Sequence, residues 1–238
     1  MSWDIVLNKG SMTSKQLAAA KGDAIDIDLF DNTDDGQTTI KDLAAAGKKV
    51  ICYFSAGSRE DWRDDANQFV WPVDYGKNMT GSEPGETWEG ENWVNVTSPK
   101  VRSIMKARIE LAAKSGCHAI DPDNVDGFSS NHQDGYTFPQ SAYSDYVNYL
   151  ADIARQNNLA MGLKNAMDLI PAVLPNISFA VNEQCHEFGE CGKYKDMTTA
   201  GLAVFNIEYK VKNCTQPAGV VLSGIFKTLA LDKLGGQC

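Results

Sequence analysis

Three aspartates lie within six positions in the sequence HAIDPDNVDGF, residues 118–128, directly after an apolar run. Asp121 and Asp123 are two positions apart, so in an extended chain their side chains project to the same face. Carboxylates gathered at a strand end could cleave a glycosidic bond. That reaction needs one carboxyl group to protonate the leaving oxygen and another to attack the sugar or activate water. A simple turn is the alternative, because DPDN consists of residues that favour turns.

A metal site at these aspartates does not fit the spacing. A calcium loop beginning at Asp121 would need an acidic or amide ligand at its fifth position, glycine at its sixth and glutamate at its twelfth. The chain has Val125, Asp126 and His132 at those places. The HExxH and CxxC patterns of zinc sites do not occur in the sequence either. We therefore expect neither a metal nor a cofactor.

A second carboxylate lies in FAVNEQCHEFGEC, residues 179–191, where Glu183 follows the apolar part. The apolar residues 179–181 would raise the pKa of the Glu183 carboxyl and suit it to act as the general acid. Asp123 would then be the nucleophile, or the general base if the enzyme inverts configuration. Asp121 shares the face of Asp123 and is the alternative residue for that role.

The rest of the chain predicts a scaffold that brings several strand ends together. Short runs rich in apolar and β-branched residues alternate with helical patterns, which is typical of a (β/α)8 TIM barrel. The helical patterns lie at residues 39–48, 98–116 and 141–158. An open doubly wound sheet is the alternative, but the sequence lacks its phosphate-binding GxGxxG loop. The expected strands cover residues 3–7, 24–30, 49–57, 117–126, 159–165, 178–185, 202–209 and 219–226.

We expect the barrel to form one domain over residues 1–238. Active sites of this fold lie at the carboxyl ends of the strands. Polar residues that close or follow an expected strand should meet at that rim, namely Ser55, Asp123, Asn165, Glu183 and Glu208.

Residues 59–97 interrupt the alternation and show little periodicity. They contain Trp62, Trp71, Trp88 and Trp93, four of the five tryptophans of the chain. The segment follows the third expected strand, at the end where a barrel carries its working loops. Core packing is the alternative for each ring. Because flat aromatic rings stack on sugar faces, we expect this Trp-rich βα loop to line a sugar cleft.

The formal net charge of −9 argues against nucleic acid and anionic membrane surfaces as partners. It favours a neutral or cationic partner. No run approaches the roughly 18 consecutive apolar residues of a membrane-spanning helix. We expect a monomer with no nucleic-acid or membrane partner.

Six cysteines, an even number, and four Asn-X-Ser/Thr sequons favour a secreted protein. Residues 1–10 lack the basic start and apolar centre of a signal peptide, so the leader is expected to have been removed. Buried cytosolic thiols are the alternative. The preferred disulfides are Cys185–Cys191 and Cys214–Cys238, which leaves Cys52–Cys117 between neighbouring strands.

The blocks VICYFSAGSREDWR, IDPDNVDGF, MGLKNA, FAVNEQCHEFGEC and AVFNIEY occur in this order. Together they closely resemble glycoside hydrolase family 114, the endo-α-1,4-polygalactosaminidases, over residues 24–209 at least. The resemblance implies a TIM barrel and a catalytic aspartate and glutamate, which the matching motifs place at Asp123 and Glu183. It also implies a cationic or partly acetylated amino-sugar polysaccharide as substrate, which a chain of charge −9 would attract.

Aromatic rings that stack on sugars and spare carboxylates that pair with ammonium groups should line the cleft. For Asp28 the alternative is a polar strand end satisfied by backbone donors. The expected substrate contacts are Asp28, Tyr53, Trp93, Asp121, Asp126, Lys164, Asn165, Tyr194, Glu208 and Tyr209.

We therefore expect a secreted endo-glycosidase that cleaves an α-1,4-linked galactosamine polymer with two carboxylates. A non-catalytic carbohydrate-binding barrel is the alternative, which the loss of one carboxylate would indicate. An enzyme of another class on the same fold, such as a deacetylase or a metal hydrolase, would need a set of metal ligands that the sequence does not offer.

Overall fold

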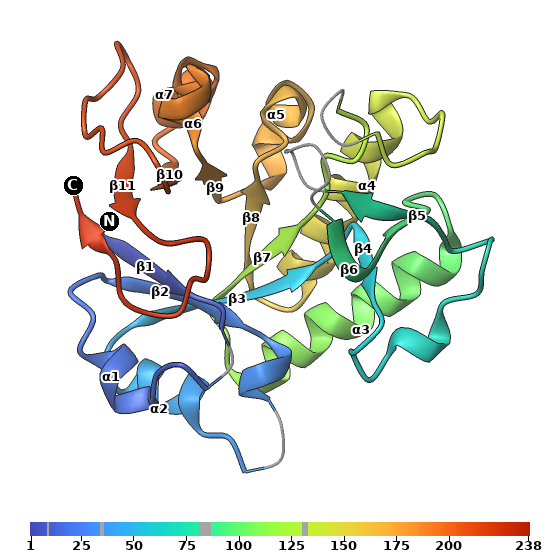
Figure 1. Ribbon diagram of the computed structural model, residues 1–238, viewed down its shortest axis with the longest axis horizontal. Coiled ribbons are helices and arrows are strands. Elements are labelled where there is room, and N and C mark those ends of the chain that lie inside the picture. Colours follow the sequence, from blue (N-terminus) through green and yellow to red (C-terminus); the bar gives the residue numbers. More distant parts are fainter. Residues whose placement is uncertain (9, 34–35, 81–86, 130–132) are drawn as a thin grey trace.

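Eight parallel strands form the frame of the described part of the chain (Figure 1). This computed structural model describes residues 1–8, 10–33, 36–80, 87–129 and 133–238. Each of these strands lies within one of the predicted runs, so the predicted strands are confirmed. They are β1 (Trp3–Val6), β2 (Ala24–Asp28), β3 (Lys49–Ser55), β7 (Ala119–Asp123), β8 (Ala160–Lys164), β9 (Phe179–Glu183), β10 (Ala203–Glu208) and β11 (Ser223–Phe226).

The sheet follows the order β1-β2-β3-β7-β8-β9-β10-β11, and β11 returns beside β1 (Figure 1). A short strand, β12 (Gly236–Gln237), pairs antiparallel with β11. At this seam Gln237 Nε2 donates to Trp3 O at 2.9 Å, and Trp3 Nε1 donates to Ser223 O at 2.7 Å. Buried Lys227 and Asp4 also form an ion pair of 2.7 Å. The fold is thus a single TIM-barrel-like domain, as predicted.

Helices cover the sheet unevenly. The long helices α3 (Pro99–Ser115) and α4 (Gln140–Gln156), with α2 (Thr39–Ala45), confirm the three predicted helices. Residues 209–222, all of which are described, contain no helix. In the described residues no helix is both long and apolar enough to cross a membrane. The short helical segments are α1 (Ser14–Ala18), η1 (Phe30–Asn32), η2 (Ala66–Gln68), η3 (Met167–Leu169), α5 (Ile170–Val173), η4 (Leu174–Asn176), α6 (Cys185–Phe188), η5 (Cys191–Tyr194) and α7 (Lys195–Thr199).

Local sequence fixes both ends of α3. Ser98 Oγ accepts hydrogen bonds from the backbone N–H groups of Lys100 and Val101, at 3.1 and 3.4 Å, and so caps the helix. Pro99 occupies the first turn, where no N–H is needed. Gly116 ends the helix with a φ of 95°, a left-handed conformation that glycine adopts without strain.

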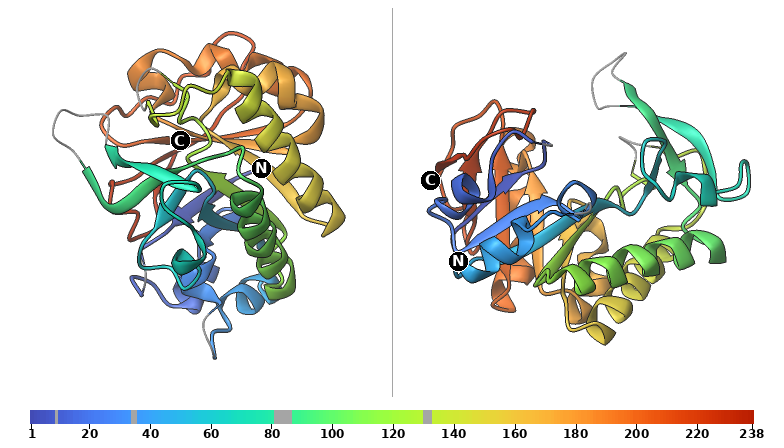
Figure 2. Two further views of the ribbon diagram at one scale, coloured as in Figure 1. Left: turned by 90° about the vertical axis from the view of Figure 1, so that its right-hand side faces the viewer. Right: turned by 90° about the horizontal axis from the view of Figure 1, so that it is seen from below.

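The segment expected to be an irregular loop instead forms an antiparallel sheet, in the order β4-β6-β5. Its strands are β4 (Ser58–Glu60), β5 (Tyr75–Thr80) and β6 (Thr87–Val94), and the sheet projects away from the barrel strands (Figure 2). The pairing of β5 with β6 contains register shifts, which explains why the sequence shows no regular alternation. Of the tryptophans in this segment, Trp93 is 1% exposed, whereas Trp62, Trp71 and Trp88 are more than half exposed.

Inward-facing residues change from apolar to polar along the barrel strands. On β7 the inward positions are Ala119, Asp121 and Asp123, and on β8 they include Gly162 and Lys164. Because side chains alternate between the two faces of a strand, the polar ends of neighbouring strands meet at the same rim of the barrel. The acidic motif of β7 is therefore part of a polar layer that several strands build together.

Aromatic rings form the floor beneath this polar layer. The ring of Trp3 stacks on Phe205 with centroids 4.8 Å apart, and the Phe179 ring lies 5.7 Å from the Phe205 ring. A Cβ atom at Gly162 would lie 2.7 Å from the Phe179 ring, so only glycine fits beside this floor. The closely packed rings separate the polar layer from the opposite end of the barrel.

Three disulfides confirm the predicted pairing. Cys52–Cys117 links β3 to the residues just before β7. Cys185–Cys191 closes the loop after β9, and Cys214–Cys238 joins the segment after β10 to the residues after β12.

Replacing both Cys52 and Cys117 by alanine should lower the free energy of unfolding by about 4 kcal/mol, because this disulfide restricts a long loop in the unfolded chain. The bridged residues are 65 positions apart, compared with 24 for Cys214–Cys238. Urea unfolding of the double variant would measure the loss, with the Cys214→Ala/Cys238→Ala variant as the matched comparison. A Cys52→Ala/Cys117→Ala variant as stable as the unmodified chain would contradict this account.

Candidate active site

The side chain of Lys164 lies between the two predicted catalytic carboxylates. Its Nζ is 3.0 Å from Asp123 Oδ2 and 3.5 Å from Glu183 Oε2. The Lys164 side chain is 3% exposed, whereas those of Asp123 and Glu183 are 17% and 26% exposed. Burial acts to lower the pKa of Lys164, but Asp123 and Glu183 outweigh it and raise that pKa well above its usual value. A permanent ammonium group thus connects two carboxylates that a substrate can reach.

Asp123 is held in place by hydrogen-bond donors from β3 and from the turn after β7. Tyr53 OH donates to Asp123 Oδ2 at 3.0 Å, and the backbone N–H of Asn124 donates to Oδ1 at 2.7 Å. The turn after Asp123 packs against the end of β3 so closely that a Cβ atom at Gly57 would lie 1.5 Å from Asn124 O. The absence of a side chain at residue 57 therefore allows the turn that orients Asp123.

Glu183 also accepts hydrogen bonds from neighbouring strands. Tyr209 OH donates to Glu183 Oε1 at 2.5 Å, and Asn165 Nδ2 donates to Oε2 at 3.1 Å. Asn165 Oδ1 accepts the Glu183 backbone N–H at 2.9 Å, so the amide holds both parts of the residue. The surroundings of this carboxyl differ from the apolar setting expected from residues 179–181, because the adjacent strands β8 and β10 lead into its polar neighbours.

Tyr194 and Glu208, two of the expected substrate contacts, are buried and bound to groups within the protein. Both are at most 1% exposed. Tyr194 OH accepts a hydrogen bond from Asn182 Nδ2 at 2.9 Å, and Glu208 Oε1 accepts one from the backbone N–H of His186 at 2.8 Å. Asn182 is adjacent to Glu183 in β9, so Tyr194 supports the strand that carries the Glu183 carboxylate.

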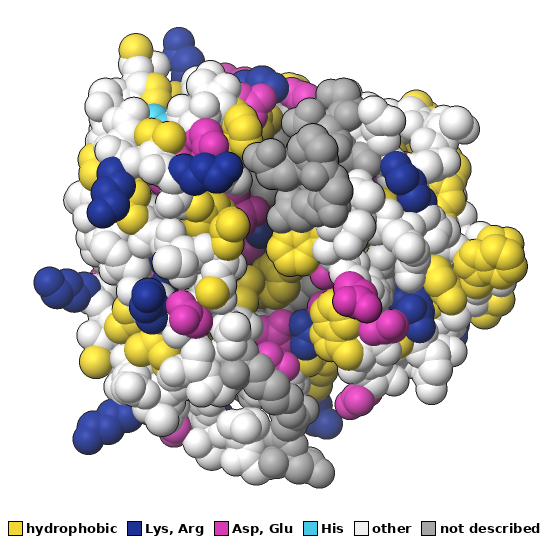
Figure 3. Space-filling view, in the orientation of Figure 1, with side chains coloured by type: hydrophobic (Ala, Val, Ile, Leu, Met, Phe, Trp, Pro, Cys, Tyr) yellow, Lys and Arg dark blue, Asp and Glu magenta, His cyan; other side chains and the backbone are white. Residues whose placement is uncertain are grey.

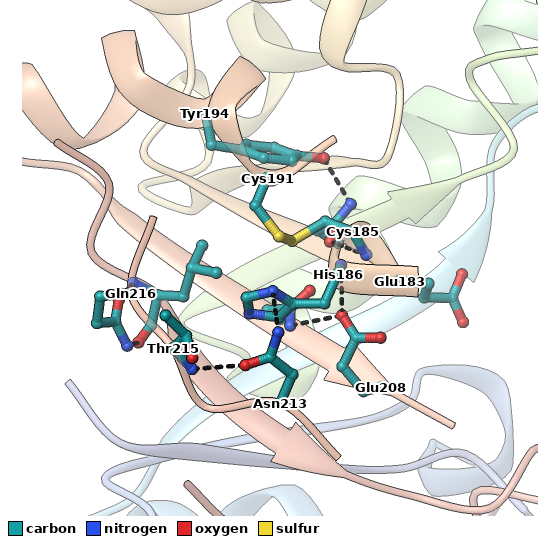
Figure 4. The surroundings of a disulfide bond; sticks show 12 residues. Glu183, Cys185, His186, Cys191, Tyr194, Glu208, Asn213, Thr215 and Gln216 are labelled. Atoms are coloured by element: carbon teal, nitrogen blue, oxygen red, sulfur yellow. Dashed lines mark hydrogen bonds between the residues drawn. A yellow bond between two sulfur atoms is a disulfide. The ribbon is translucent and has the colours of Figure 1, made fainter. Parts of the chain in front are cut away.

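The Cys185–Cys191 disulfide holds the loop that follows Glu183. In the view of Figure 4 the disulfide appears between Tyr194 and His186, and Glu183 lies to one side with its carboxylate directed away from the sulfur atoms. Cys185, His186 and Cys191 lie close enough together to hold a metal ion. The two sulfur atoms are bonded to each other, however, so they are not available as thiolate ligands. This cluster therefore has the features of a structural support.

Asp28 and Trp93 are also buried, at 4% and 1% exposure. Asp28 is an expected ammonium contact, but its oxygens accept hydrogen bonds from Arg63 Nη1 and Nη2 at 3.1 and 2.5 Å. Its Oδ1 also accepts the backbone N–H of Asp31 at 2.9 Å, the strand-end arrangement foreseen as the alternative. Asp126 is half-buried in the turn after β7.

Asp121 forms a buried carboxyl pair with Asp26. Both residues are fully buried, and their oxygens have no hydrogen-bond donor among the described residues. Burial, with the charge of Asp121, raises the pKa of Asp26 well above its usual range. Burial also raises the pKa of Asp121 to about 7, against the opposing effect of Lys164. A proton shared by the two carboxyls satisfies both residues. Because Asp121 is fully buried, a substrate cannot reach its carboxyl group, which favours Asp123 for the catalytic role.

Glu91 on β6 is a site residue that the sequence analysis missed. Its carboxylate accepts a hydrogen bond from Ser58 Oγ at 2.8 Å at the rim next to Asp123. In the sequence TWEGENWV, Glu91 stands two positions before Trp93 and therefore shares a face with it. That alternation is the available signal, but the register shifts between β5 and β6 leave it too short to predict a strand from the sequence.

The structure thus groups Tyr53, Asn165, Lys164 and Tyr209 around the pair Asp123 and Glu183. Figure 3 shows a hollow at the centre of this face with acidic and basic side chains inside it. Two carboxylates, each bound by a tyrosine and both beside one lysine, form a compact charged centre. Such a centre could position an acid and a nucleophile on a sugar.

Comparisons with known proteins agree with this arrangement. The family model for glycoside-hydrolase family GH114 matches residues 1–238. The crystal structure of Aspergillus fumigatus Ega3 in complex with galactosamine has 36% sequence identity and a TM-score of 0.86, covering 100% of this chain and 94% of that one.

Two more distant proteins are also similar. The glycoside hydrolase domain of Pseudomonas aeruginosa PelA has the same fold, with 15% identity, a TM-score of 0.70 and coverage of 98% of this chain and 97% of that one. An uncharacterised protein of Methanocaldococcus jannaschii is 27% identical over 185 residues, or 75% of this chain and 48% of that protein. The chain therefore spans about half the length of this curated relative.

Replacing Asp26 with asparagine should make stability less dependent on pH. The Asp26–Asp121 pair binds its proton more tightly in the folded state, so its stabilisation is fully present below the unfolded carboxyl pKa of about 4. It is lost as pH rises through about 7, the raised pKa of Asp121. An asparagine amide would donate to Asp121 without a shared proton.

Urea unfolding between about pH 5 and pH 8 would test this expectation, since the variant should gain a few kcal/mol over the unmodified chain across that range. The exposed Asp64→Asn substitution is the matched control. Parallel pH profiles for the Asp26→Asn variant and the unmodified chain would rule out the shared proton.

Proposed function

The chain belongs to glycoside-hydrolase family GH114 and is a glycoside hydrolase, and we propose that it is a secreted, endo-acting enzyme that cleaves an α-1,4-linked galactosamine polymer. The observation that carries this proposal is the pair of accessible carboxylates, Asp123 and Glu183, on either side of Lys164. Ega3, whose structure contains galactosamine, is similar to the chain over its full length and supports the choice of substrate.

The separation of the carboxylates favours retention of configuration. Their distances to Lys164 Nζ are 3.0 and 3.5 Å, so Asp123 Oδ2 and Glu183 Oε2 are at most about 6.5 Å apart. Retaining glycosidases hold their carboxyl groups about 5–5.5 Å apart, and inverting ones roughly 6.5–9.5 Å apart. The two oxygens that face Lys164 are thus close enough for the retaining range, and on this ground we propose a retaining mechanism.

We assign Asp123 as the nucleophile and Glu183 as the acid and base. Asp123 is closer to the Lys164 ammonium group, which stabilises the negative charge that a nucleophile needs. Asp123 attacks the anomeric carbon while Glu183 gives its proton to the leaving oxygen. Glu183 then takes a proton from the water that hydrolyses the glycosyl-enzyme, and Asp123 leaves. Glu183 is the more exposed of the two carboxyls, as proton exchange with the leaving group and water requires.

The net charge supports the proposed substrate, and the disulfides support the proposed secretion. Polygalactosamine with free amines is cationic near neutral pH, and a chain of net charge −9 attracts it. Three disulfides are typical of proteins in oxidising compartments, where a secreted enzyme would meet an extracellular polysaccharide.

Asp123→Ala and Glu183→Ala should each lower turnover of partly deacetylated poly-α-1,4-galactosamine by about 1,000-fold or more, because each removes a group that takes part in bond cleavage. Azide should restore turnover to Asp123→Ala and yield a β-glycosyl azide, since it would replace the nucleophile from the same face. Glu187→Gln, in the loop after Glu183, is the matched control and should retain turnover. Near-normal turnover by either alanine variant would refute the assignment of that residue.

The first product released from the α-linked polymer should have the α configuration, because retention involves two displacements. Proton NMR of the anomeric signals early in the reaction, before mutarotation, would show it. Initial release of the β anomer would show an inverting reaction and would make Asp123 the general base.

A further inference from the structure

Among the described residues at the rim, most of the enclosed carboxylates have a cation beside them. The catalytic Asp123 contacts Lys164 at 3.0 Å, and Glu183 shares the same ammonium group. Asp28 and Glu60 lie 2.5 and 3.0 Å from Arg63. Their negative charges are therefore compensated within the protein, as burial of a charge requires.

Glu91 is held next to this group by a chain of hydrogen bonds. Glu91 Oε2 accepts from Ser58 Oγ at 2.8 Å, and Ser58 Oγ lies 2.6 Å from Ser55 Oγ. Asn124 Nδ2 donates to Ser55 Oγ at 2.8 Å, and the Asn124 backbone N–H donates to Asp123. The carboxylate of Glu91 is thus fixed relative to the turn that carries the nucleophile.

Glu91 has no cation of its own in the described part of the chain. It is half-buried, it forms no ion pair with a described residue, and its second oxygen, Oε1, has no hydrogen-bond partner there. Arg63 is the positive group that acts on it, but Arg63 already binds Asp28 and Glu60. The negative charge of such an enclosed carboxylate stays uncompensated until a cation binds to it.

The charges around Glu91 have the expected effect on its protonation. Burial raises its pKa to about 7; the hydrogen bond from Ser58 acts to lower it, and the charges of Glu60 and Asp123 raise it further. Glu91 in turn contributes to the raised pKa of the Tyr53 phenol, whose hydroxyl donates to Asp123. Glu91 is therefore close to the proposed catalytic centre, and a positive ligand would stabilise its ionised form.

We propose that Glu91 binds the ammonium group of a galactosamine unit seated beside Asp123, and that it thereby selects deacetylated polymer over acetylated polymer. This inference rests on the proposed function and names the group that recognises the amine. A free amine supplies the cation that Glu91 lacks, in a charge-assisted hydrogen bond to its second oxygen. An N-acetyl group has no charge and would leave that carboxylate uncompensated.

Glu91→Gln tests the inference because it keeps the shape of the side chain and removes the charge. We expect the ratio of kcat/KM for deacetylated to acetylated oligomers to fall about tenfold, mainly through KM for the deacetylated oligomer. For the unmodified enzyme this KM should fall as pH rises through about 7, where Glu91 ionises, and the variant should lose that pH dependence. Glu89→Gln, at an exposed position of β6 two residues away, is the matched control and should keep the ratio.

Direct binding separates this inference from the proposed function. Deacetylated and acetylated galactosamine oligomers would be titrated into the Glu183→Gln variant, with Glu91 present or replaced by glutamine, at low and high salt. A selective loss of affinity for the deacetylated oligomer supports the role of Glu91. Equal affinities with and without Glu91 would refute it, even if the enzyme cleaves the polymer. An unmodified enzyme that fails to cleave either oligomer would instead refute the proposed function.

Discussion

The ammonium group of Lys164 is the charge on which the active site depends. It is buried between Asp123 and Glu183, and it would be costly to enclose without them. The two carboxylates in turn would repel each other at this distance without a cation. Parallel pairing of β8 with its neighbours β7 and β9 brings these three side chains together. The register of three strands therefore determines whether the centre forms at all.

Apart from Glu91, the acidic groups discussed at the rim follow the same requirement for compensation. Asp28 and Glu60 share Arg63, while Arg108 donates to Asp65 and to the end of β3. The guanidinium groups of Arg63 and Arg108 also lie against the Phe30 ring, 4.7 and 4.9 Å from its centroid. Asp26 and Asp121 satisfy the requirement with a proton instead of a cation. The rim thus combines a high density of carboxyl groups with a defined protonation state.

Features encoded by local sequence could be predicted, and those that arise between strands could not. The apolar runs gave the barrel strands, and the Ser98-Pro99 start and Gly116 end gave α3. The antiparallel sheet was not predictable in this way, because the shifted pairing of β5 with β6 leaves no regular pattern along the chain. The same limit applied to side-chain environments. The apolar neighbours of Glu183 in sequence suggested an apolar setting, whereas Tyr209 and Asn165 contact its carboxyl in the fold. Asp28 was expected to face substrate, but its partner Arg63 lies on a different segment.

The seam between β1 and β11 has a consequence for how the protein is made. Residues 3–6 leave the ribosome well before their neighbours in β11 and β12, which lie at the other end of the barrel sequence. Until then one edge of the growing sheet is unpaired and Asp4 lacks its Lys227 partner. An open strand edge is a template for intermolecular pairing. The yield of active enzyme during expression should therefore depend on how well this open edge is shielded, more than on the strength of any single contact.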